Sequence, residues 1–221
     1  LYKTTRKQIK IFMINTLLSS EYFYFILLMI FTAIPVGFFA GLFGIGGGLI
    51  SVPFLFFIFD YLNIDNQYLM HLSVGTAFSI TIMTSSVSVI THNKHGGVDF
   101  NLLKTFGAFV VIGVIFGIFL ASFLQTKVLV LMFSVIVYFF GAYLLLFQEN
   151  NKKKRIKFYT APKFMCGFFS GFVSAPMGIT GAMINVPILR YFGYPIKKAI
   201  GTSAAVGFII SLFGAIGFFT S

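Results

Sequence analysis

Long apolar stretches separated by short polar segments fill most of the chain. A helix needs about 20 apolar residues to cross a bilayer, and six stretches reach or exceed that length. They are Glu21–Phe59, Met70–Thr91, Leu102–Leu124, Lys127–Phe147, Phe164–Phe192 and Ala199–Phe219. The pattern predicts an all-α fold, a polytopic transmembrane helix bundle. The first stretch is much longer than one crossing requires, so we expect it to be interrupted.

The composition supports a membrane protein, because 58% of the residues are hydrophobic and only 10% are charged. In soluble domains about a quarter of the residues are charged. The formal net charge is +11, and the basic residues gather mainly in Lys3–Lys10 and Lys152–Lys157, which flank apolar stretches as cytoplasmic loops do. Basic and aromatic residues are not interleaved as in proteins that bind single strands. The expected partner is therefore the lipid bilayer, and no nucleic acid.

A glycine-rich segment, Gly37–Pro53, interrupts the first apolar stretch. Each glycine in a helix interior costs about 1 kcal/mol relative to alanine, and a proline about 3 kcal/mol, so a plain membrane anchor would not carry this segment. The segment Gly171–Pro187 repeats it without a gap. The aligned pairs are Gly37 with Gly171, Gly44 with Gly178, Gly47 with Gly181 and Val52-Pro53 with Val186-Pro187. We interpret this as an internal duplication.

The duplication and the loops divide the chain into four parts. They are a basic N-terminal segment (1–20), a first repeat (21–148), a basic cytoplasmic linker (149–163) and a second, incomplete repeat (164–221). The N-terminal segment fits either a helix lying at the membrane interface or a frayed basic tail. Only two of the first repeat's four apolar stretches recur in the second. We therefore expect the sequence to lack roughly 50 residues of a complete second repeat.

Loop charges predict the number of crossings. If both basic clusters are cytoplasmic, an even number of crossings separates them. This holds when each glycine-rich stretch enters the membrane, breaks near its glycines and makes one net crossing, which gives two parallel repeats of four spans each. Against this trend, Arg190, Lys197 and Lys198 then lie outside the cytoplasm.

Helix breaks inside a membrane indicate a binding site. They leave backbone N–H and C=O groups that protein or a water-filled cavity must satisfy, the N-terminus of a half-helix attracts anions, and matched breaks in a duplicated protein indicate a substrate site at the repeat interface. Hydroxyl and amide side chains beside the breaks could add hydrogen bonds. The predicted substrate-binding residues are Gly44, Gly46, Gly47, Gly48, Ser51, Pro53, Thr76, Gly178, Gly181, Asn185, Pro187, Thr202 and Ser203.

Simpler explanations exist for parts of this site. Any single glycine is better explained by close helix packing, and it is the paired arrangement that favours transport. For Thr76 and Thr202, bonding between helices is an equally good explanation. A membrane enzyme could use His92, His95 and Asp99, but their spacing is weak evidence for a metal. We predict no enzyme, no cofactor and no metal, and no carboxylate inside a span supports proton coupling.

The two glycine segments and the motifs after them resemble one known family. Gly37–Pro53 followed by Val74-Gly-Thr-Ala77, and Gly171–Pro187 followed by Ile200-Gly-Thr-Ser203, resemble the two repeats of the sulfite exporter TauE/SafE family of membrane permeases. The resemblance covers residues 24–219. It implies a multi-pass permease of the bacterial cell membrane that moves sulfite, sulfonates or related sulfur-containing anions.

The sequence departs from the family pattern in two ways. Thr180 and Ala182 stand opposite Gly46 and Gly48, so the second glycine cluster is sparse. The last two spans of the second repeat are also missing. These departures leave an alternative open, a non-transporting membrane scaffold or the remnant of a permease. The anion, the direction of movement, the coupling ion and homo-oligomerisation stay open as well.

Overall fold

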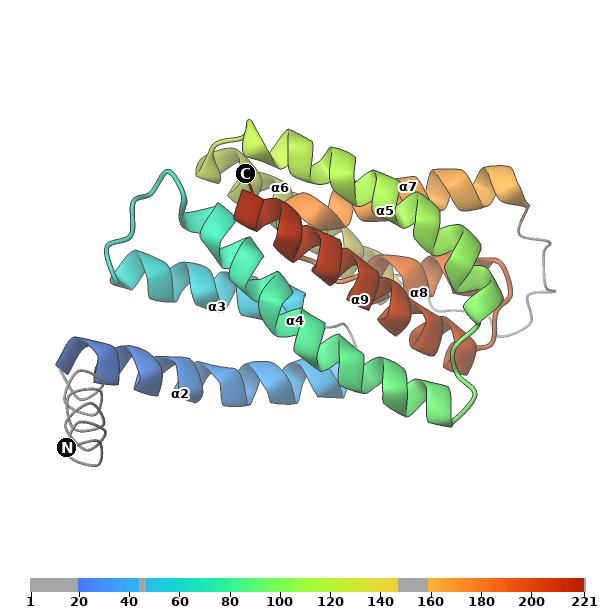
Figure 1. Ribbon diagram of the computed structural model, residues 1–221, viewed down its shortest axis with the longest axis horizontal. Coiled ribbons are helices and arrows are strands. Elements are labelled where there is room, and N and C mark those ends of the chain that lie inside the picture. The colour runs from blue at the N-terminus through green and yellow to red at the C-terminus, as the bar shows by residue number, and fades with distance from the viewer. Residues whose placement is uncertain (1–19, 44–46, 147–158, 221) are drawn as a thin grey trace, which may run out of the picture. The chain divides into compact units, whose positions relative to one another are not determined.

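The computed structural model describes residues 20–43, 47–146 and 159–220, and every regular element in these ranges is an α-helix (Figure 1). The helices are α2 (Ser20–Phe43), α3 (Gly48–Tyr61), α4 (Leu69–Lys94), α5 (Phe100–Ser122), α6 (Thr126–Leu146), α7 (Thr160–Met177), α8 (Ala182–Tyr191) and α9 (Ile196–Thr220). The predicted all-α class is confirmed. The predicted N-terminal segment and most of the predicted linker lie outside the described residues.

The chain divides into two compact units, Leu1–Phe38 and Phe39–Ser221. Most of α2 belongs to the first unit. It is a 24-residue apolar helix that contains Pro35, and its side chains Phe31, Ile34 and Phe38 are exposed. An apolar helix with large exposed apolar side chains is typical of a segment that contacts lipid. Helices α3 to α9 form the second unit.

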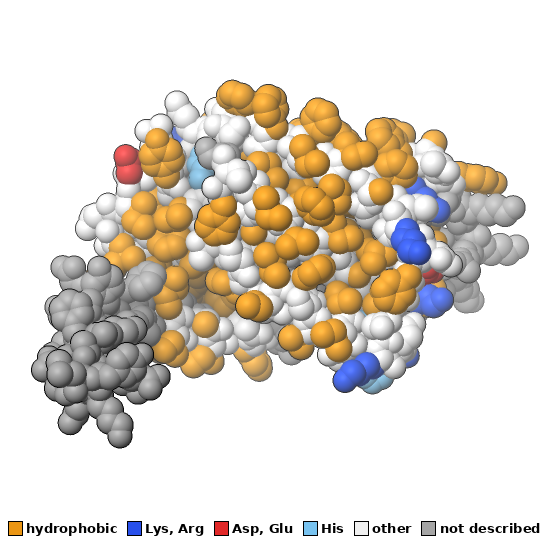
Figure 2. Space-filling view, in the orientation of Figure 1, with side chains coloured by type: hydrophobic (Ala, Val, Ile, Leu, Met, Phe, Trp, Pro, Cys, Tyr) orange, Lys and Arg blue, Asp and Glu red, His pale blue; other side chains and the backbone are white. Residues whose placement is uncertain are grey.

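Four helices of the described chain are long and apolar enough to cross a membrane. They are α4, α5, residues Thr126–Tyr143 of α6, and α9. Each falls on a stretch predicted from the sequence, so the prediction of a polytopic helical bundle is confirmed. The face in Figure 2 is covered with exposed apolar side chains. Ile115, Phe116 and Phe119 of α5 are exposed as well. Such a surface is expected where lipid replaces water.

Contacts at glycines fix the directions of the long helices. They are Gly75 with Phe218 and Gly214 with Phe78 between α4 and α9, and Gly107 with Ile209 and Gly217 with Ile118 between α5 and α9. Helices α4 and α9 are therefore antiparallel, whereas α5 and α9 are parallel (Figure 1). Small residues at these contacts let the backbones approach closely, as is usual in membrane bundles.

Helices α5 and α7 are also parallel and are joined by glycines spaced four residues apart on each helix. Each glycine faces a backbone carbonyl of the other helix: Gly113 faces Phe168, Gly117 faces Phe172, Gly167 faces Phe106 and Gly171 faces Val110. A methyl group on these glycines would press against or overlap the facing carbonyl. Close packing is therefore the role of Gly171, the first residue of the second glycine segment.

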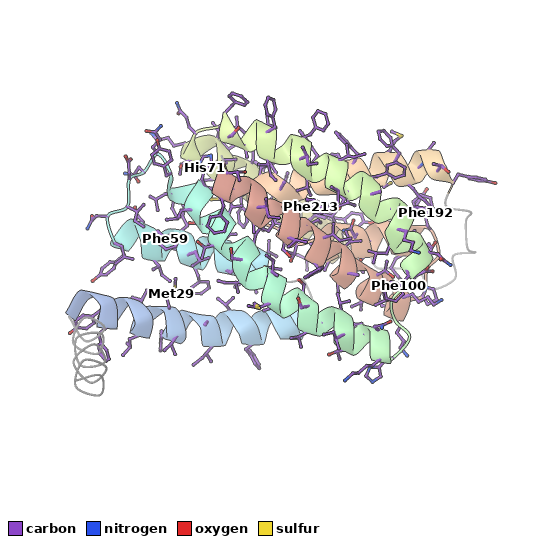
Figure 3. The ribbon with its side chains drawn as sticks, viewed as in Figure 1. Met29, Phe59, His71, Phe100, Phe192 and Phe213 are labelled. Carbon is purple, nitrogen blue, oxygen red and sulfur yellow. The ribbon has the colours of Figure 1, made fainter. Side chains whose placement is uncertain are left out.

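Basic residues gather at one end of this unit, which we call the basic end. It comprises the loops 95–99 and 192–195, the end of α6 and the start of α7, and Phe100 and Phe192 lie there in Figure 3. The opposite end comprises the loops 62–68 and 123–125, and His71 lies beside it. The basic end carries Lys94, Lys104, Lys163, Arg190, Lys197 and Lys198, and the opposite end carries Asp60, Asp65 and Lys127. Figure 2 shows the lysine and arginine side chains of the visible face gathered mainly at one end.

Two helices, α3 and α8, are too short to cross a bilayer. They have 14 and 10 residues, against about 20 for a crossing. Both begin at mid-height of the unit, because Gly47 lies near Thr81 in the middle of α4 and Gly181 lies near Val206 in the middle of α9. From there α3 runs to the opposite end and α8 runs to the basic end (Figure 1).

The prediction of one net crossing is wrong for the second glycine-rich stretch. Helix α7 is parallel to α5 and starts at the basic end, and α8 returns to that end, so the pair is a re-entrant hairpin. The physical reason is Gly178, whose positive φ of 65° lets the chain reverse. As a result Arg190, Lys197 and Lys198 lie at the basic end, which removes the exception to the charge rule.

The prediction of parallel repeats is also wrong. Helices α3 and α4 meet at the opposite end, α8 and α9 meet at the basic end, and α4 and α9 are antiparallel. The α3–α4 and α8–α9 pairs are therefore related as inverted repeats, an arrangement found in many transporters. Loop charges alone do not fix the orientation of the repeats, because one hairpin changes the parity of the crossings between two loops.

Candidate functional site

The second glycine segment breaks between α7 and α8. Gly178 caps α7 in the left-handed conformation, and its N–H donates to the carbonyl of Ser174. Helix α8 begins directly after Gly181, whose carbonyl accepts the N–H of Asn185 at 2.7 Å. The hairpin therefore places four non-helical residues, 178–181, at mid-height among the helices.

The first break lies before α3. Helix α3 begins after Gly47, whose carbonyl accepts the N–H of Ser51 at 2.9 Å. A methyl group on Gly47 would lie 3.9 Å from the hydroxyls of Thr81 and Thr84 on α4. Of the predicted site residues, Gly44 and Gly46 lie outside the described residues.

The two breaks touch one another. A methyl group on Gly48 would overlap the carbonyl oxygen of Gly178 and lie 3.4 Å from the backbone nitrogen of Thr180. A methyl group on Gly178 would lie 2.7 Å from a side-chain carbon of Val52 in α3. Only glycine lets the backbones meet this closely. The contact joins the two matched breaks, which lie far apart in the sequence, although Gly48 itself aligns with Ala182 and Gly178 with Gly44.

The helix packing around the breaks repeats as the sequence does. A methyl group on Gly47 would contact Thr81, and a methyl group on Gly207 would lie 3.8 Å from the nitrogen of Gly181. Gly47 and Gly181 are matched residues of the two breaks. Thr81 and Gly207 are matched residues of α4 and α9, by the same alignment that pairs Gly75 with Gly201. The duplication therefore extends from the sequence to the contacts between each break and its neighbouring helix.

Two helix N-termini meet at this contact. The first turn of a helix has N–H groups without intrahelical partners, and its dipole is equivalent to roughly half a positive charge. Helix α3 starts at Gly48 and α8 starts at Ala182, on the two sides of the contact between Gly48 and Gly178. Their combined field favours an anion at mid-height of the bundle.

The two prolines lie inside the half-helices, Pro53 in α3 and Pro187 in α8. A proline has no N–H, so it cannot bond the carbonyl four residues earlier. The carbonyls concerned belong to Leu49 and Met183, in the first turns beside the breaks. The matched prolines therefore loosen both half-helices at the end that faces the site.

Polar side chains line the second break. The hydroxyl of Ser170 on α7 donates to Oδ1 of Asn185 on α8 at 2.6 Å. This bond turns Nδ2 of Asn185 toward Gly181, where a methyl group would overlap it. Asn185, Ser170 and Ser174 are 0% exposed, and Thr180 is 3% exposed. Oγ of Ser174, Oγ1 of Thr180 and Nδ2 of Asn185 are buried and have no hydrogen-bond partner among the described residues.

The remaining predicted residues fall in different places. Ser203 is buried on α9, with Oγ unpartnered among the described residues, one turn before Gly207, which faces Thr180. Thr202 instead accepts the N–H of Asp99 at 3.0 Å and so ties loop 95–99 to α9 at the basic end. Ser51 is buried, and its hydroxyl makes only a long 3.5 Å contact with the carbonyl of Gly48.

Thr76 is partly buried on α4, two residues after Val74. The side chain of Val74 lies 3.4 Å from the position that a methyl group on Gly178 would occupy. Thr76 is therefore on the helix that covers the second break. The residue of α4 that lies against the second break is Val74, not Thr76.

The alternative site at His92, His95 and Asp99 has a structural explanation. The carboxylate of Asp99 caps α5 by accepting the N–H of Leu102 at 3.1 Å. Nδ1 of His95 lies 2.8 Å from the carbonyl of Thr91. Within the described part of the chain, no group of three or more metal-ligating side chains is present. These residues shape the loop between α4 and α5.

The sequence reasoning missed Ser170, Ser174 and Thr180. Thr180 stood out only as a departure from the glycine pattern. Ser170 and Ser174 are one helical turn apart in an apolar helix and so lie on one face. That spacing was the signal that could have identified a polar face turned toward α8.

The model of the sulfite exporter TauE/SafE family matches residues 28–221. The chain belongs to this family. A probable membrane transporter protein of Methanocaldococcus jannaschii is 29% identical, over 92% of this chain and 76% of its own length. A probable membrane transporter protein of Haemophilus influenzae is 30% identical, over 90% and 75%, and YunE of Bacillus subtilis is 23% identical, over 79% and 71%. No solved structure matches this chain.

Family membership and the four apolar helices together establish a multi-pass membrane transporter. The relatives carry the same general description, probable membrane transporter protein. The predicted resemblance is thereby confirmed.

Proposed function

We propose that this transporter moves small anions, such as sulfite, sulfonates or related sulfur-containing anions, across the cell membrane. The observation that supports the proposal is the meeting of two half-helix N-termini at mid-height, where Gly48 packs on the carbonyl of Gly178. Helix N-termini favour anions. The family description, a sulfite exporter, supports sulfur oxyanions as the class of substrate.

The substrate contacts come from the residues at this meeting point. Backbone groups of Gly47, Gly48, Gly178 and Gly181 approach the anion, and Asn185 and Ser203 supply side-chain hydrogen bonds. Neither break, residues 44–51 or 174–185, contains a charged residue. The anion is therefore held by dipoles and hydrogen bonds, which allows it to leave again, since transport requires release as well as binding.

The charges at the two ends orient the protein. The basic end carries most of the described lysine and arginine residues of the second unit, and cytoplasmic loops carry such an excess. The basic end therefore faces the cytoplasm, and the α7–α8 hairpin enters the membrane from that side. Lipid headgroups contact Lys197 and Lys198, both of which are exposed.

Flux through liposomes tests the proposal. The purified protein is reconstituted in vesicles loaded with sulfite, methanesulfonate, taurine or chloride. We expect efflux of sulfite or of a sulfonate above that of protein-free vesicles. The absence of flux for every sulfur anion would contradict the proposal.

A further inference from the structure

The second break holds a cluster of hydrogen-bonding groups that lack partners. Oγ of Ser174, Oγ1 of Thr180, Nδ2 of Asn185 and Oγ of Ser203 are buried, and none has a partner among the described residues. Buried polar atoms are nearly always hydrogen-bonded, because burial without a bond is costly. Several such atoms close together indicate that something else completes their bonding.

Hydroxyl groups elsewhere in the unit do not share this property. On α4, the hydroxyls of Ser73, Thr81 and Ser85 each donate to a carbonyl one turn earlier. On α9, the hydroxyl of Ser211 donates to the carbonyl of Phe208 at 3.0 Å. These serine and threonine hydroxyls therefore make the usual hydrogen bond to a backbone carbonyl of their own helix. The groups at the second break are the exception.

The backbone brings the unpartnered groups to one place. Ser170 fixes Oδ1 of Asn185, so the Nδ2 end of the Asn185 amide lies against Gly181 at the break. Ser174 lies one turn nearer the break than Ser170 and on the same face of α7.

Helix α9 completes the cluster from its other side. Gly207 lies against Thr180, with its added methyl 3.6 Å from the Thr180 side chain. Ser203 lies one turn from Gly207 on the same face of α9. The three helices α7, α8 and α9 thus each contribute a group to the break.

The chemistry of the cluster defines what it can bind. The amide of Asn185 offers two N–H donors, and each hydroxyl offers one. All are neutral, and two helix N-termini add the equivalent of about one positive charge. A doubly charged anion would carry uncompensated charge into a buried site, which is costly. One negative charge spread over several oxygen acceptors fits the donors and the field.

We propose that Ser174, Thr180, Asn185 and Ser203 form the substrate subsite, and that it selects singly charged oxyanions, such as a sulfonate group or hydrogen sulfite, over doubly charged sulfate. The inference rests on the proposed function for the identity of the site. It adds that side-chain recognition belongs to the second repeat and that net charge decides selectivity.

Binding and flux are measured together to test the subsite. Binding is followed as the rise in melting temperature of the purified protein in detergent, with sodium methanesulfonate or sodium sulfate at equal ionic strength. Flux of the same anions is followed in liposomes. The variants are Thr180→Val and Ser174→Ala, which remove one hydroxyl with little change in volume. Asn185→Asp keeps the acceptor for Ser170 and replaces the donors with an oxygen. Ser73→Ala is the matched control, since Ser73 is equally buried but bonded within α4.

We expect methanesulfonate to raise the melting temperature and sulfate to leave it unchanged. Thr180→Val and Ser174→Ala should each raise the half-saturating concentration of methanesulfonate about tenfold, the usual effect of losing a hydrogen bond to a charged group. Asn185→Asp should abolish the shift, and Ser73→Ala should behave as wild type. Equal stabilisation by sulfate would overturn the charge selectivity, and unchanged affinity in Thr180→Val and Ser174→Ala would overturn the subsite.

The two proposals fail in different ways. If Thr180→Val and Ser174→Ala leave the flux of sulfur anions unchanged, the proposed permease function holds and the proposed subsite is refuted. Methanesulfonate binding that these variants weaken, without flux of any sulfur anion, would support the subsite and refute the permease. If Asn185→Asp does not fold, as judged by size-exclusion chromatography, the two neutral variants still decide the outcome.

Discussion

The two helix breaks have the same backbone plan but different side chains. The first break is a run of glycines, and α4 beside it carries hydroxyls that bond within their own helix. The second break replaces two of those glycines with Thr180 and Ala182, and Asn185 replaces Ser51. Its polar groups stay unpartnered among the described residues. The two breaks thus share their glycine positions and meet in one backbone contact, and unpartnered polar side chains lie at the second of them among the described residues.

The difference between the breaks explains why Gly48 of the first break faces the second. The carbonyl of Gly178 fits only against a residue without a side chain, which Gly48 provides. The first break supplies a glycine surface without side chains and the dipole of α3, and the second break supplies side-chain hydrogen-bond donors. An inverted pair of half-helices allows both N-termini to act on one anion.

The largest effect is expected where the breaks touch. Gly48→Ala places a methyl group on the carbonyl of Gly178, and both atoms belong to backbone that cannot move independently. We expect flux to fall to the level of empty vesicles. Gly141→Ala on α6 is the control, since a methyl group there meets nothing within 4 Å. Normal flux in Gly48→Ala would show that the contact between the breaks is not needed for transport.

The next effect separates glycines that pack helices from glycines that form the site. Gly171→Val puts a branched side chain against the carbonyl of Val110 in α5. Overpacking of this kind costs about 1–3 kcal/mol, so the melting temperature in detergent should fall. The half-saturating anion concentration of the folded fraction should stay unchanged, because the contact between Gly171 and Val110 lies about two helical turns from Gly178. A change in affinity without loss of stability would place Gly171 in the site instead.

The sequence predicted the helices and the place of the breaks because both depend on local composition. Apolar length defines α4, α5 and α9, and glycine with proline marks Gly47 and Gly181 as points where a helix stops. The direction of the chain after each break is not local. It depends on one residue, Gly178, adopting a positive φ, and nothing in the glycine pattern distinguishes a hairpin from a kink.

Side-chain roles were predictable only in part for a similar reason. Asn185 was found because it aligns with Ser51, but alignment cannot show that Ser170 holds one side of its amide. Thr202 and Ser203 are neighbours and looked equivalent as candidates. Which of them faces the break depends on the rotation of α9, and that rotation is set by its contacts with α4, α5, α7 and α8.

A smaller effect compares the matched residues Asn185 and Ser51. Asn185→Ser, which copies the first break, removes the amide donors and should raise the half-saturating methanesulfonate concentration about tenfold. Ser51→Ala should change it less than about twofold, because a 3.5 Å contact with the carbonyl of Gly48 is a weak bond. Binding measured by thermal shift in both variants tests the difference between the repeats. Equal losses in the two variants would mean that both breaks recognise the anion through side chains.

The smallest effect separates Thr202 from Ser203. Thr202→Val removes the acceptor for the N–H of Asp99, and the loss of one hydrogen bond costs about 1 kcal/mol of stability. The anion affinity should not change, because Thr202 ties loop 95–99 to α9 at the basic end. Ser203→Ala should do the reverse, lowering affinity with little loss of stability, because its hydroxyl has no partner to lose among the described residues. Thermal unfolding with and without methanesulfonate measures both quantities in one experiment. If Thr202→Val weakens binding as much as Ser203→Ala does, the tie at the basic end and the anion site are coupled, and opening of loop 95–99 becomes part of transport.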